Sequence, residues 1–322
     1  MRASAAVERL AGLQAQWAPS PYLALWARLD GFKREQLERA LVRESVLKAT
    51  LMRATLHLVS AADYPLFAAG VREAATLART RGVDPPPAET VAAAVELARR
   101  KGRVTRRELL SLLGYERPPA PTHDPRPQRQ LQWLLVLAQL EQAPEAARWS
   151  PPRVTPFRRV ELPLAEPEVG RVHLARRYLA AYGPASRADL ACWSRVPLRD
   201  LDPALSSLRL RHFRDEGGRD LVDLPGAPIA APRTATPVRF LPRWDELLLA
   251  YDRRERVLPE RFRRTVIAPN GDVLDTFLVD GFVAGSWRRE NGRVVAEPFE
   301  PLPLAARRDV EDEARRLAAF LG

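Results

Sequence analysis

The amino-acid sequence predicts an α+β protein, in which three helix-rich units, each closed by a β-hairpin, precede a β-rich C-terminal domain. Two observations lead to this fold class. Helical periodicity gives way to short runs of strand-forming residues at intervals of about 75 residues. Beyond Pro237, alternating strands with Asn-Gly turns replace the helices. Helices closed by a hairpin follow the element order of a winged helix, which often binds DNA.

The predicted winged-helix units span residues 1–82, 83–164 and 165–230, and the C-terminal domain spans 231–322. A length of 322 residues with 46% hydrophobic residues is enough for several domains with a sizeable core. No clear sequence repeat accompanies the three units.

The first unit is predicted to begin with one helix over residues 1–16, which the prolines of QWAPSPY end. A short helix over 22–29 and an amphipathic helix in GFKREQLERALVRE follow. The segment SVLKATLMRATLHLVS then predicts two strands around a turn near Leu51–Met52.

The second unit follows a predicted helix over 63–80. It contains a helix over 88–101, a helix start at Thr105 with Glu108 as its capping-box partner, and a third helix around 127–140. The segment VTPFRRVEL is expected to complete its hairpin.

The third unit is predicted to contain a long helix from Glu168 that stops at Gly183–Pro184. A helix capped by Ser186 follows, with Asp189 three places on. The segment LRLRHFRDEGGRDLVDL predicts a hairpin with its turn at Gly217–Gly218.

The C-terminal domain is predicted from the segment RTVIAPNGDVLDTFLVDGFVAGSWRRENGRVVAEPF. Its strands turn at Asn270–Gly271 and Asn291–Gly292, and a helix over Arg307–Leu321 ends the chain. The segment LPRWDELLLAYDRRERVLP is expected to pack this domain against the helices through apolar residues such as Trp244 and Tyr251.

The charge balance favours a polyanionic partner. Basic residues number 51 against 40 acidic ones, which gives a net charge of +11 and an isoelectric point near 10.6. Lysine occurs only at Lys33, Lys48 and Lys101, so GC-rich codons explain the abundance of arginine. Codon usage does not explain the excess of bases over acids. We therefore favour nucleic acid over an ordinary solvated surface.

Several kinds of chemistry lack support in the sequence. The single Cys192 excludes an internal disulfide and, inside the apolar run LACW, is better explained as a small buried residue. The histidines His57, His123, His173 and His212 lack metal-ligand spacing. No nucleotide, dinucleotide, hydrolase or zinc-protease motif is found, so we expect neither metal nor organic cofactor.

The expected location is the cytoplasm. No window approaches 18 uncharged apolar residues, and Glu8 stands where a signal peptide would have its apolar stretch. The sequence therefore predicts no membrane attachment.

The pair Gln14-Ala15-Gln16 is weak as an isolated signal, because two glutamines this close usually solvate a helix end. In a continuous helix, positions i and i+2 lie about 200° apart. Both amides can therefore reach one site only if the helix ends between or beside them, which the following prolines permit.

Six segments in chain order resemble one known family: GLQAQ, LWARL, MRATLHLVSAADY, RRYLAAYGPASRADLACW, LPRWDELLLAYDRRERVLP and GDVLDTFLVDGFVAGSW. The chain is similar in these segments to the AlkZ-like winged-helix DNA glycosylases of bacteria. The resemblance implies three tandem winged helices and a β-rich C-terminal domain that form a C-shaped, positively charged DNA channel.

The resemblance also implies a function. The family hydrolyses the N-glycosidic bond of alkylated bases, notably bulky N7-alkylguanine adducts and interstrand crosslinks. Its motif is Gln-apolar-Gln in one branch, which resembles self-resistance enzymes, and Gln-apolar-Asp in the other. Gln14 and Gln16 match the first branch as catalytic residues. We expect a monofunctional glycosylase that acts as a monomer on double-stranded DNA.

Two amides suit this chemistry. Glutamine has no pKa suited to a general base, but alkylation at N7 makes guanine cationic and a good leaving group. The enzyme then mainly has to position water beside an oxocarbenium-like sugar. The carbonyls of Gln14 and Gln16 can accept hydrogen bonds from that water, and their dipoles stabilise positive charge. We expect an open cleft in place of a closed flipped-base pocket.

Further candidates for contacts with DNA or the lesion come from these segments and from the third hairpin: Trp17, Arg53, Thr55, His57, Arg214 and Arg219. Arg53 and Thr55 flank His57 at strand spacing and are predicted to share its face. Each of these candidates has a structural alternative. Trp17 would be a core residue, His57 a hydrogen-bonded histidine in a strand, and Thr55 a residue of the local structure. Arg214 and Arg219 would lie on ordinary exposed hairpins.

The competing class of function is a winged-helix transcriptional regulator that binds DNA without cutting it. A small-molecule enzyme is disfavoured by the missing cofactor motifs. Release of the base from N7-methylguanine DNA separates a glycosylase from a regulator.

Overall fold

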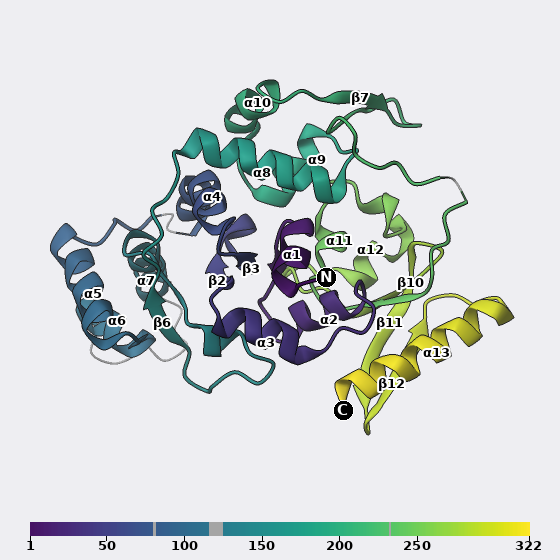
Figure 1. Cartoon of the computed structure of the whole chain (residues 1–322), viewed down its shortest axis with the longest axis horizontal. Coiled ribbons are helices and arrows are strands. Elements are labelled where there is room, and N and C mark those ends of the chain that lie inside the picture. The colour runs from purple at the N-terminus through teal and green to yellow at the C-terminus, as the bar shows by residue number, and fades with distance from the viewer. Residues whose placement is uncertain (80–81, 116–124, 232) are drawn as a thin grey trace.

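The structure is a computed structural model that describes residues 1–79, 82–115, 125–231 and 233–322. The chain contains both helices and antiparallel strands, in agreement with a mixed helix and sheet fold (Figure 1). His123, one of the histidines considered as a metal ligand in the sequence, lies outside the described residues. In the described parts, no helix is long and apolar enough to cross a lipid bilayer. The winged-helix character of the units and the C-shaped channel stay predictions.

The helices occur in all parts of the chain. The first half contains α1 (Ala3–Arg9), α2 (Ser20–Trp26), α3 (Arg34–Val42), α4 (Tyr64–Arg79), α5 (Ala88–Lys101), α6 (Arg106–Leu112) and α7 (Arg126–Leu137). The second half contains α8 (Pro167–Tyr182), α9 (Arg187–Ser194), α10 (Leu198–Ser206), α11 (Glu246–Leu249), α12 (Glu260–Val266) and α13 (Leu304–Leu321). Short 3-10 helices are η1 (Met52–Ala54), η2 (Pro144–Ala147) and η3 (Arg254–Arg256).

A six-stranded antiparallel sheet joins the first two predicted units. Its spatial order is β1 (Leu13–Gln14), β3 (Leu56–Ser60), β2 (Val46–Thr50), β5 (Leu140–Gln142), β6 (Pro156–Arg159) and β4 (Val104–Thr105). The two halves meet where β2 pairs with β5, at the register pair Lys48 and Gln142. The predicted boundary between residues 82 and 83 therefore separates units whose strands share one sheet.

The predicted single helix over residues 1–16 is wrong. The helix α1 ends at Arg9, and the backbone then reverses through Ala11 (φ 54°) and Gly12 (φ 95°). The amide of Gly12 donates to the Val7 carbonyl at 3.0 Å, a bond typical of a helix C-terminus. A side chain at Gly12 would also lie 3.1 Å from Val59. Because the chain leaves the helix here, the next residues form β1.

The hairpins of the first and third units follow the prediction, whereas the strand predicted before Asn270–Gly271 falls largely in α12, and only an isolated bridge joins Ile267 and Val273 across that turn. β2 and β3 pair around η1. β7 (Arg211–Arg214) and β8 (Asp220–Asp223) pair around the Gly217–Gly218 turn and project from the body at the top of Figure 1. The C-terminal sheet has the order β12 (Arg293–Pro298), β11 (Phe282–Glu290), β10 (Thr276–Val279) and β9 (Arg239–Leu241), and α13 packs beside it.

Close packing of α4 and α8 brings the third unit against the first. A Cβ atom on Gly170 in α8 would lie 2.5 Å from the backbone nitrogen of Gly70 in α4, so only glycine permits this approach. The helix that follows, α9, is thereby held near η1.

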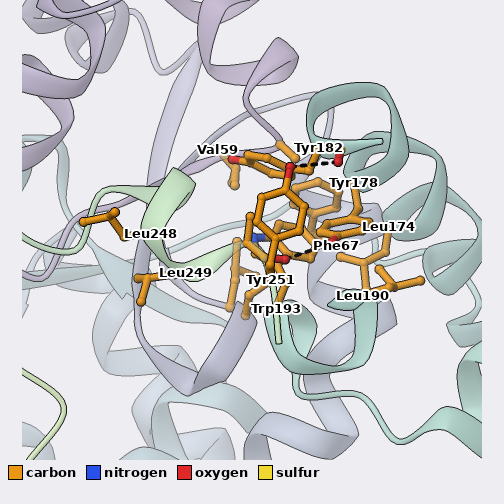
Figure 2. Close-up of a cluster of buried hydrophobic side chains, with 14 of the residues drawn as sticks. Val59, Phe67, Leu174, Tyr178, Tyr182, Leu190, Trp193, Leu248, Leu249 and Tyr251 are labelled. Carbon is orange, nitrogen blue, oxygen red and sulfur yellow. Dashed lines mark hydrogen bonds between the residues drawn. The ribbon is translucent and has the colours of Figure 1, made fainter. Parts of the chain in front are cut away.

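The largest core cluster contains aromatic side chains from α8, α9 and the segment after α11: Tyr178, Tyr182, Trp193 and Tyr251 (Figure 2). The Tyr178 hydroxyl donates to the Ala250 carbonyl, and the Tyr182 hydroxyl donates to the Leu10 carbonyl, each at 2.8 Å. These bonds satisfy buried hydroxyl groups. They also fix α8 relative to α11 and to the end of α1.

Candidate active site

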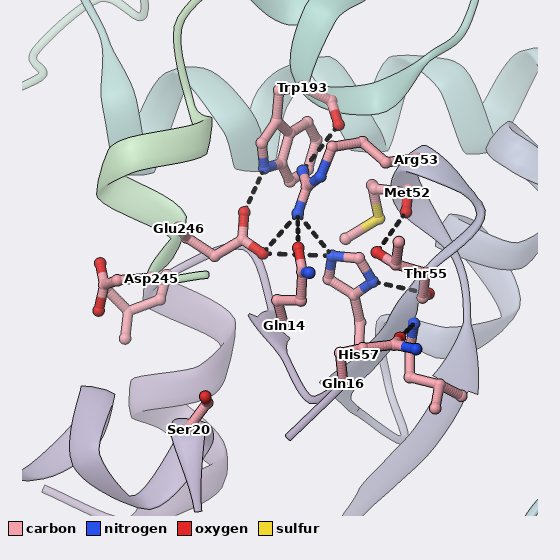
Figure 3. Close-up of polar contacts among 12 residues, drawn as sticks. Gln14, Gln16, Ser20, Met52, Arg53, Thr55, His57, Trp193, Asp245 and Glu246 are labelled. Atoms are coloured by element: carbon pink, nitrogen blue, oxygen red, sulfur yellow. Dashed lines mark hydrogen bonds and ion pairs between the residues drawn. The ribbon is translucent and has the colours of Figure 1, made fainter. Parts of the chain in front are cut away.

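The Gln14-Ala15-Gln16 motif lies in β1 and in the residues just after it. An extended backbone places residues two apart on the same side of the chain. Ala15, between them, is buried in the core formed with α1, α2 and α3. Both glutamines lie beside β3 (Figure 3). The strand therefore supplies an arrangement that a continuous helix would not.

Gln14 is buried, and its amide has a defined orientation. The side chain is 6% exposed, and its Oε1 accepts a hydrogen bond from Arg53 Nη2 at 2.8 Å. Because a guanidinium only donates, this contact identifies the amide oxygen. Gln14 Nε2 makes no hydrogen bond with the described residues and is not enclosed by them. It is therefore the end of the side chain that solvent reaches.

Arg53 connects four groups (Figure 3). Its Nη1 donates to the Trp193 carbonyl at 2.9 Å, and its Nη2 lies 2.8 Å from both Gln14 Oε1 and Glu246 Oε1. His57 Nε2 is 3.0 Å from the same Nη2. The Arg53 backbone is left-handed (φ 54°, ψ 14°) within η1, and not part of a strand shared with His57 as predicted. We call Gln14, Arg53, His57, Trp193 and Glu246 the Arg53 network.

Glu246, at the start of α11, is an ionised carboxylate inside the protein. Burial alone raises its pKa, but the charge of Arg53 and the hydrogen bond with His57 lower the pKa to about 2. Trp193 Nε1 donates to its Oε2 at 2.9 Å, while Arg53 and His57 contact its Oε1. Both oxygens are therefore occupied, so Glu246 holds its neighbours and does not reach a substrate.

His57 is completely enclosed, with 0% of its side chain exposed. Its Nδ1 lies 3.0 Å from the Thr55 carbonyl oxygen, which only accepts, so Nδ1 carries a proton. Its Nε2 faces Glu246 Oε1 at 3.2 Å and Arg53 Nη2 at 3.0 Å. In this arrangement His57 offers no atom to DNA or to a lesion, and it fits the alternative of a hydrogen-bonded histidine in a strand.

Gln16 is exposed and lines a cleft of 640 Å³ between the sheet and the helices of the second unit. Its Oε1 accepts from the Leu56 amide at 3.3 Å, which leaves one oxygen lone pair and the amide nitrogen available. We expected both amides to open onto one cleft. Gln16 lies at the cleft, whereas Gln14 does not line the cleft and is held in the Arg53 network.

The carboxyl group of Glu141, in β5, lines the same cleft. It accepts from the Tyr64 hydroxyl at 3.0 Å and from the Thr50 amide at 3.3 Å. Burial raises the pKa of Glu141 to about 8, against the hydrogen bonds from Tyr64 and Thr50, which lower it. The group is therefore mostly uncharged at neutral pH.

The other predicted contacts lie apart from the Arg53 network. Trp17 is half-buried, and the Arg243 guanidinium lies 4.7 Å from its ring. Thr55 Oγ1 donates to the Met52 carbonyl at 3.2 Å and so closes the turn before β3.

The predicted anchors of the third hairpin lie at its surface, distant in sequence from the glutamines. Arg214 pairs with Asp220 at 3.1 Å, and Arg219 pairs with Asp215 at 2.6 Å. Both contacts are local, but only the Arg214 pair is fully exposed, so Asp220 is the readily exchangeable partner, whereas the Arg219–Asp215 pair is partly buried.

Two members of the network, Trp193 and Glu246, were missed as site residues in the sequence. Glu246 follows Asp245, whose side chain accepts from the Leu247 amide and caps α11. An Asp-Glu pair before three leucines is typical of a helix start, so it carries no signal for a buried ion pair. Glu246 is 193 residues from Arg53, and only the folded chain shows the contact.

The fold and this site can be placed among known proteins. A family model described as DNA glycosylase AlkZ-like matches residues 7–320, so the chain belongs to this family of DNA glycosylases, whose substrate is DNA. The match does not favour the alternative of a transcriptional regulator.

A sequence comparison and a structure comparison both lead to a glycosylase of Streptomyces sahachiroi. The chain is 26% identical over 347 residues to an interstrand DNA cross-link repair glycosylase, with 99% of this chain and 91% of the relative covered. It is similar in structure to the DNA glycosylase AlkZ, with a TM-score of 0.76, 25% identity, and the same coverage of 99% and 91%. Both similarities extend over nearly the whole chain.

Proposed function

We propose that the protein is a monofunctional DNA glycosylase of the Gln-apolar-Gln branch. It hydrolyses the N-glycosidic bond of N7-alkylguanine in double-stranded DNA, including bulky adducts and interstrand crosslinks, in DNA repair or self-resistance. The cross-link repair relative supports this substrate class. The observation that carries the proposal is an exposed amide at a cleft, Gln16, next to a second amide, Gln14, that a buried ion pair holds in place.

The two amides have different roles in this proposal. Gln16 Oε1 retains a lone pair that accepts a hydrogen bond from the attacking water and orients it toward the sugar. Gln14 Oε1 is occupied by Arg53, so its Nε2 donates to an oxygen of the target nucleotide. Neither amide has to remove a full proton, because the cationic base leaves readily and the water attacks an oxocarbenium-like carbon.

Arg53 and Glu246 are positioning residues. A guanidinium beside Gln14 would oppose the positive charge that develops on the sugar, but the Glu246 carboxylate at 2.8 Å compensates it. The pair therefore orients the Gln14 amide without adding net charge to the site. This role replaces the phosphate contact predicted for Arg53, whose guanidinium is occupied by four partners.

The position of Lys48 supports the proposed monofunctional character. A lyase needs an amine nucleophile at the abasic sugar. Lys48 lies on β2, and burial lowers its pKa to about 8. However, its Nζ donates to the Ala146 carbonyl at 3.3 Å, and it does not line the cleft. We therefore expect an intact abasic strand as product, with no adduct trapped by borohydride.

The contacts of Trp17, Thr55, Arg214 and Arg219 with DNA remain part of the proposal, as does action as a monomer. Arg214 can exchange its aspartate partner for a phosphate at little cost, because exposed ion pairs contribute about 0–1 kcal/mol. Such contacts would hold the duplex while the glutamines face the lesion.

The test is release of N7-methylguanine from a duplex oligonucleotide with excess enzyme, measured by mass spectrometry of the free base. Gln16→Ala and Gln14→Ala are each expected to slow release by about 100-fold, the effect of removing one transition-state hydrogen bond. Both variants should retain salt-sensitive DNA binding.

Gln128→Ala is the matched control. It removes an identical amide from the far wall of the same cleft and should release N7-methylguanine at the wild-type rate. Normal rates for both Gln14→Ala and Gln16→Ala would show that the glutamine pair is not the catalytic site.

A further inference from the structure

The cleft at Gln16 is much larger than the positioning of one water requires. Its 640 Å³ fall within the range of about 300–1,000 Å³ that is typical of small-molecule pockets. One wall is a face of α7, which combines apolar and amide side chains at helical spacing: Gln128, Leu131, Gln132 and Leu135. Leu56, on the sheet side, is the residue whose amide binds Gln16.

The position of this cleft relative to Gln16 identifies what can enter it. In guanine, N7 and N9 belong to the same imidazole ring, so a substituent on N7 begins next to the glycosidic bond. Because Gln16 itself lines the cleft, a water that Gln16 orients at that bond lies at the border of this space, and a substituent on N7 begins beside it.

The charges around the cleft limit the chemistry of the substituent. Arg106, Arg107 and Arg153 line it and are exposed, and none of them makes an ion pair or hydrogen bond with the described part of the chain. The carboxyl group that also lines it, Glu141, is mostly uncharged at neutral pH. Apolar walls with guanidinium and amide donors favour apolar groups that carry oxygen acceptors, and they oppose cations.

We propose that this cleft is the subsite for the substituent on N7 of the alkylated guanine, and that it selects apolar, oxygen-bearing substituents over cationic ones of equal size. The inference rests on the proposed glycosylase function and adds to it the residues that determine which adduct is released. The glutamines provide the chemistry, and the α7 wall and the three arginines provide the selectivity.

The test compares duplexes with N7-methyl-, N7-benzyl-, N7-(4-carboxybenzyl)- and N7-(4-aminomethylbenzyl)guanine. Each rate of release is divided by the rate of spontaneous depurination of the same duplex. For the wild-type protein we expect the carboxybenzyl adduct to be released at least fivefold faster than the aminomethylbenzyl adduct.

Gln132→Trp fills the cleft and should slow release of the benzyl adduct at least tenfold, with less than a twofold change for the methyl adduct. Val154→Trp is a second filling variant at a position that is 62% exposed, so its folding is not at risk. Ser111→Trp, exposed on α6 and outside the cleft, is the matched control and should change neither rate.

The inference is overturned if both filling variants leave the benzyl adduct unaffected or slow the methyl adduct equally. Equal wild-type rates for the two charged adducts would overturn the proposed charge selectivity. If the wild-type protein releases no N7-methylguanine, the proposed function fails instead, and the two failures are thereby distinguished.

Discussion

Replacement of Glu246 by glutamine tests whether the buried ion pair keeps the site electrically neutral. Glu246→Gln preserves the size and the acceptor oxygen but leaves the Arg53 charge, which is 13% exposed, without compensation beside Gln14. Two full positive charges about 7 Å apart at an effective dielectric constant of about 20 repel each other by about 2 kcal/mol, which sets the scale of the expected effect. Release of N7-methylguanine should then slow roughly 30-fold.

The same substitution has a separate effect on stability. The lowering of the Glu246 pKa from 4.5 to about 2 corresponds to about 3 kcal/mol of stabilisation of the folded state. Because the folded pKa is depressed, this contribution is present above pH 4.5 and is lost as the pH falls toward 2. Wild type and Glu246→Gln should therefore differ in urea unfolding at pH 7 and converge on acidification.

A double variant separates the two effects. Arg53→Met combined with Glu246→Gln removes both charges, so it should release base faster than Glu246→Gln alone if charge compensation is the reason for the pair. Single-turnover kinetics at saturating enzyme measure this directly. Wild-type kinetics for Glu246→Gln, together with a lower unfolding temperature, would refute the reasoning and leave the pair a role in folding alone.

Three further changes have defined outcomes. Gly12→Ala should cost about 1–3 kcal/mol of stability in thermal unfolding, because a left-handed residue in close contact with β3 acquires a side chain. Glu141→Gln should be more stable than wild type at pH 9 and equal to it near pH 4.5 in urea titrations, because a carboxyl group with a raised pKa destabilises the fold as the pH rises. Arg214→Ala with Arg219→Ala should lower the slope of log affinity against log salt by about 2 if both contact phosphates.

Much of the fold was predictable because its signals are local. The helix predicted over 88–101 coincides with α5, and the capping boxes at Thr105 and Ser186 form as predicted. The hairpin turns at Gly217–Gly218 and Asn291–Gly292 also occur at the predicted positions. In each case a few neighbouring residues determine the backbone conformation.

The prediction of one helix over residues 1–16 was wrong because it also relied on local signals alone. Apolar residues continue at helical spacing through Leu10 and Leu13, so periodicity alone extends the helix into the motif. Gly12 was the local sign of its end, but glycine inside a helical pattern only lowers stability and does not require a break. The pairing of β1 with β3 decides the outcome, and that contact joins residues distant in sequence.

The candidate site was half predictable. Gln14 and Gln16 were found from the motif, and Arg53 and His57 from the segment around β3. The contacts of Arg53 and His57 with Glu246 could not be predicted from the sequence. A buried carboxylate is stable only when its partners are in place, and the sequence alone does not show those partners.

The span of the Arg53 network along the chain affects how the enzyme is made. Gln14 and Arg53 emerge early from the ribosome, but the carboxylate that neutralises Arg53 is contributed by α11, far downstream. A polypeptide that ends before α11 lacks the carboxylate that binds Arg53. The Arg53 network is therefore complete only in a chain that has been translated past α11.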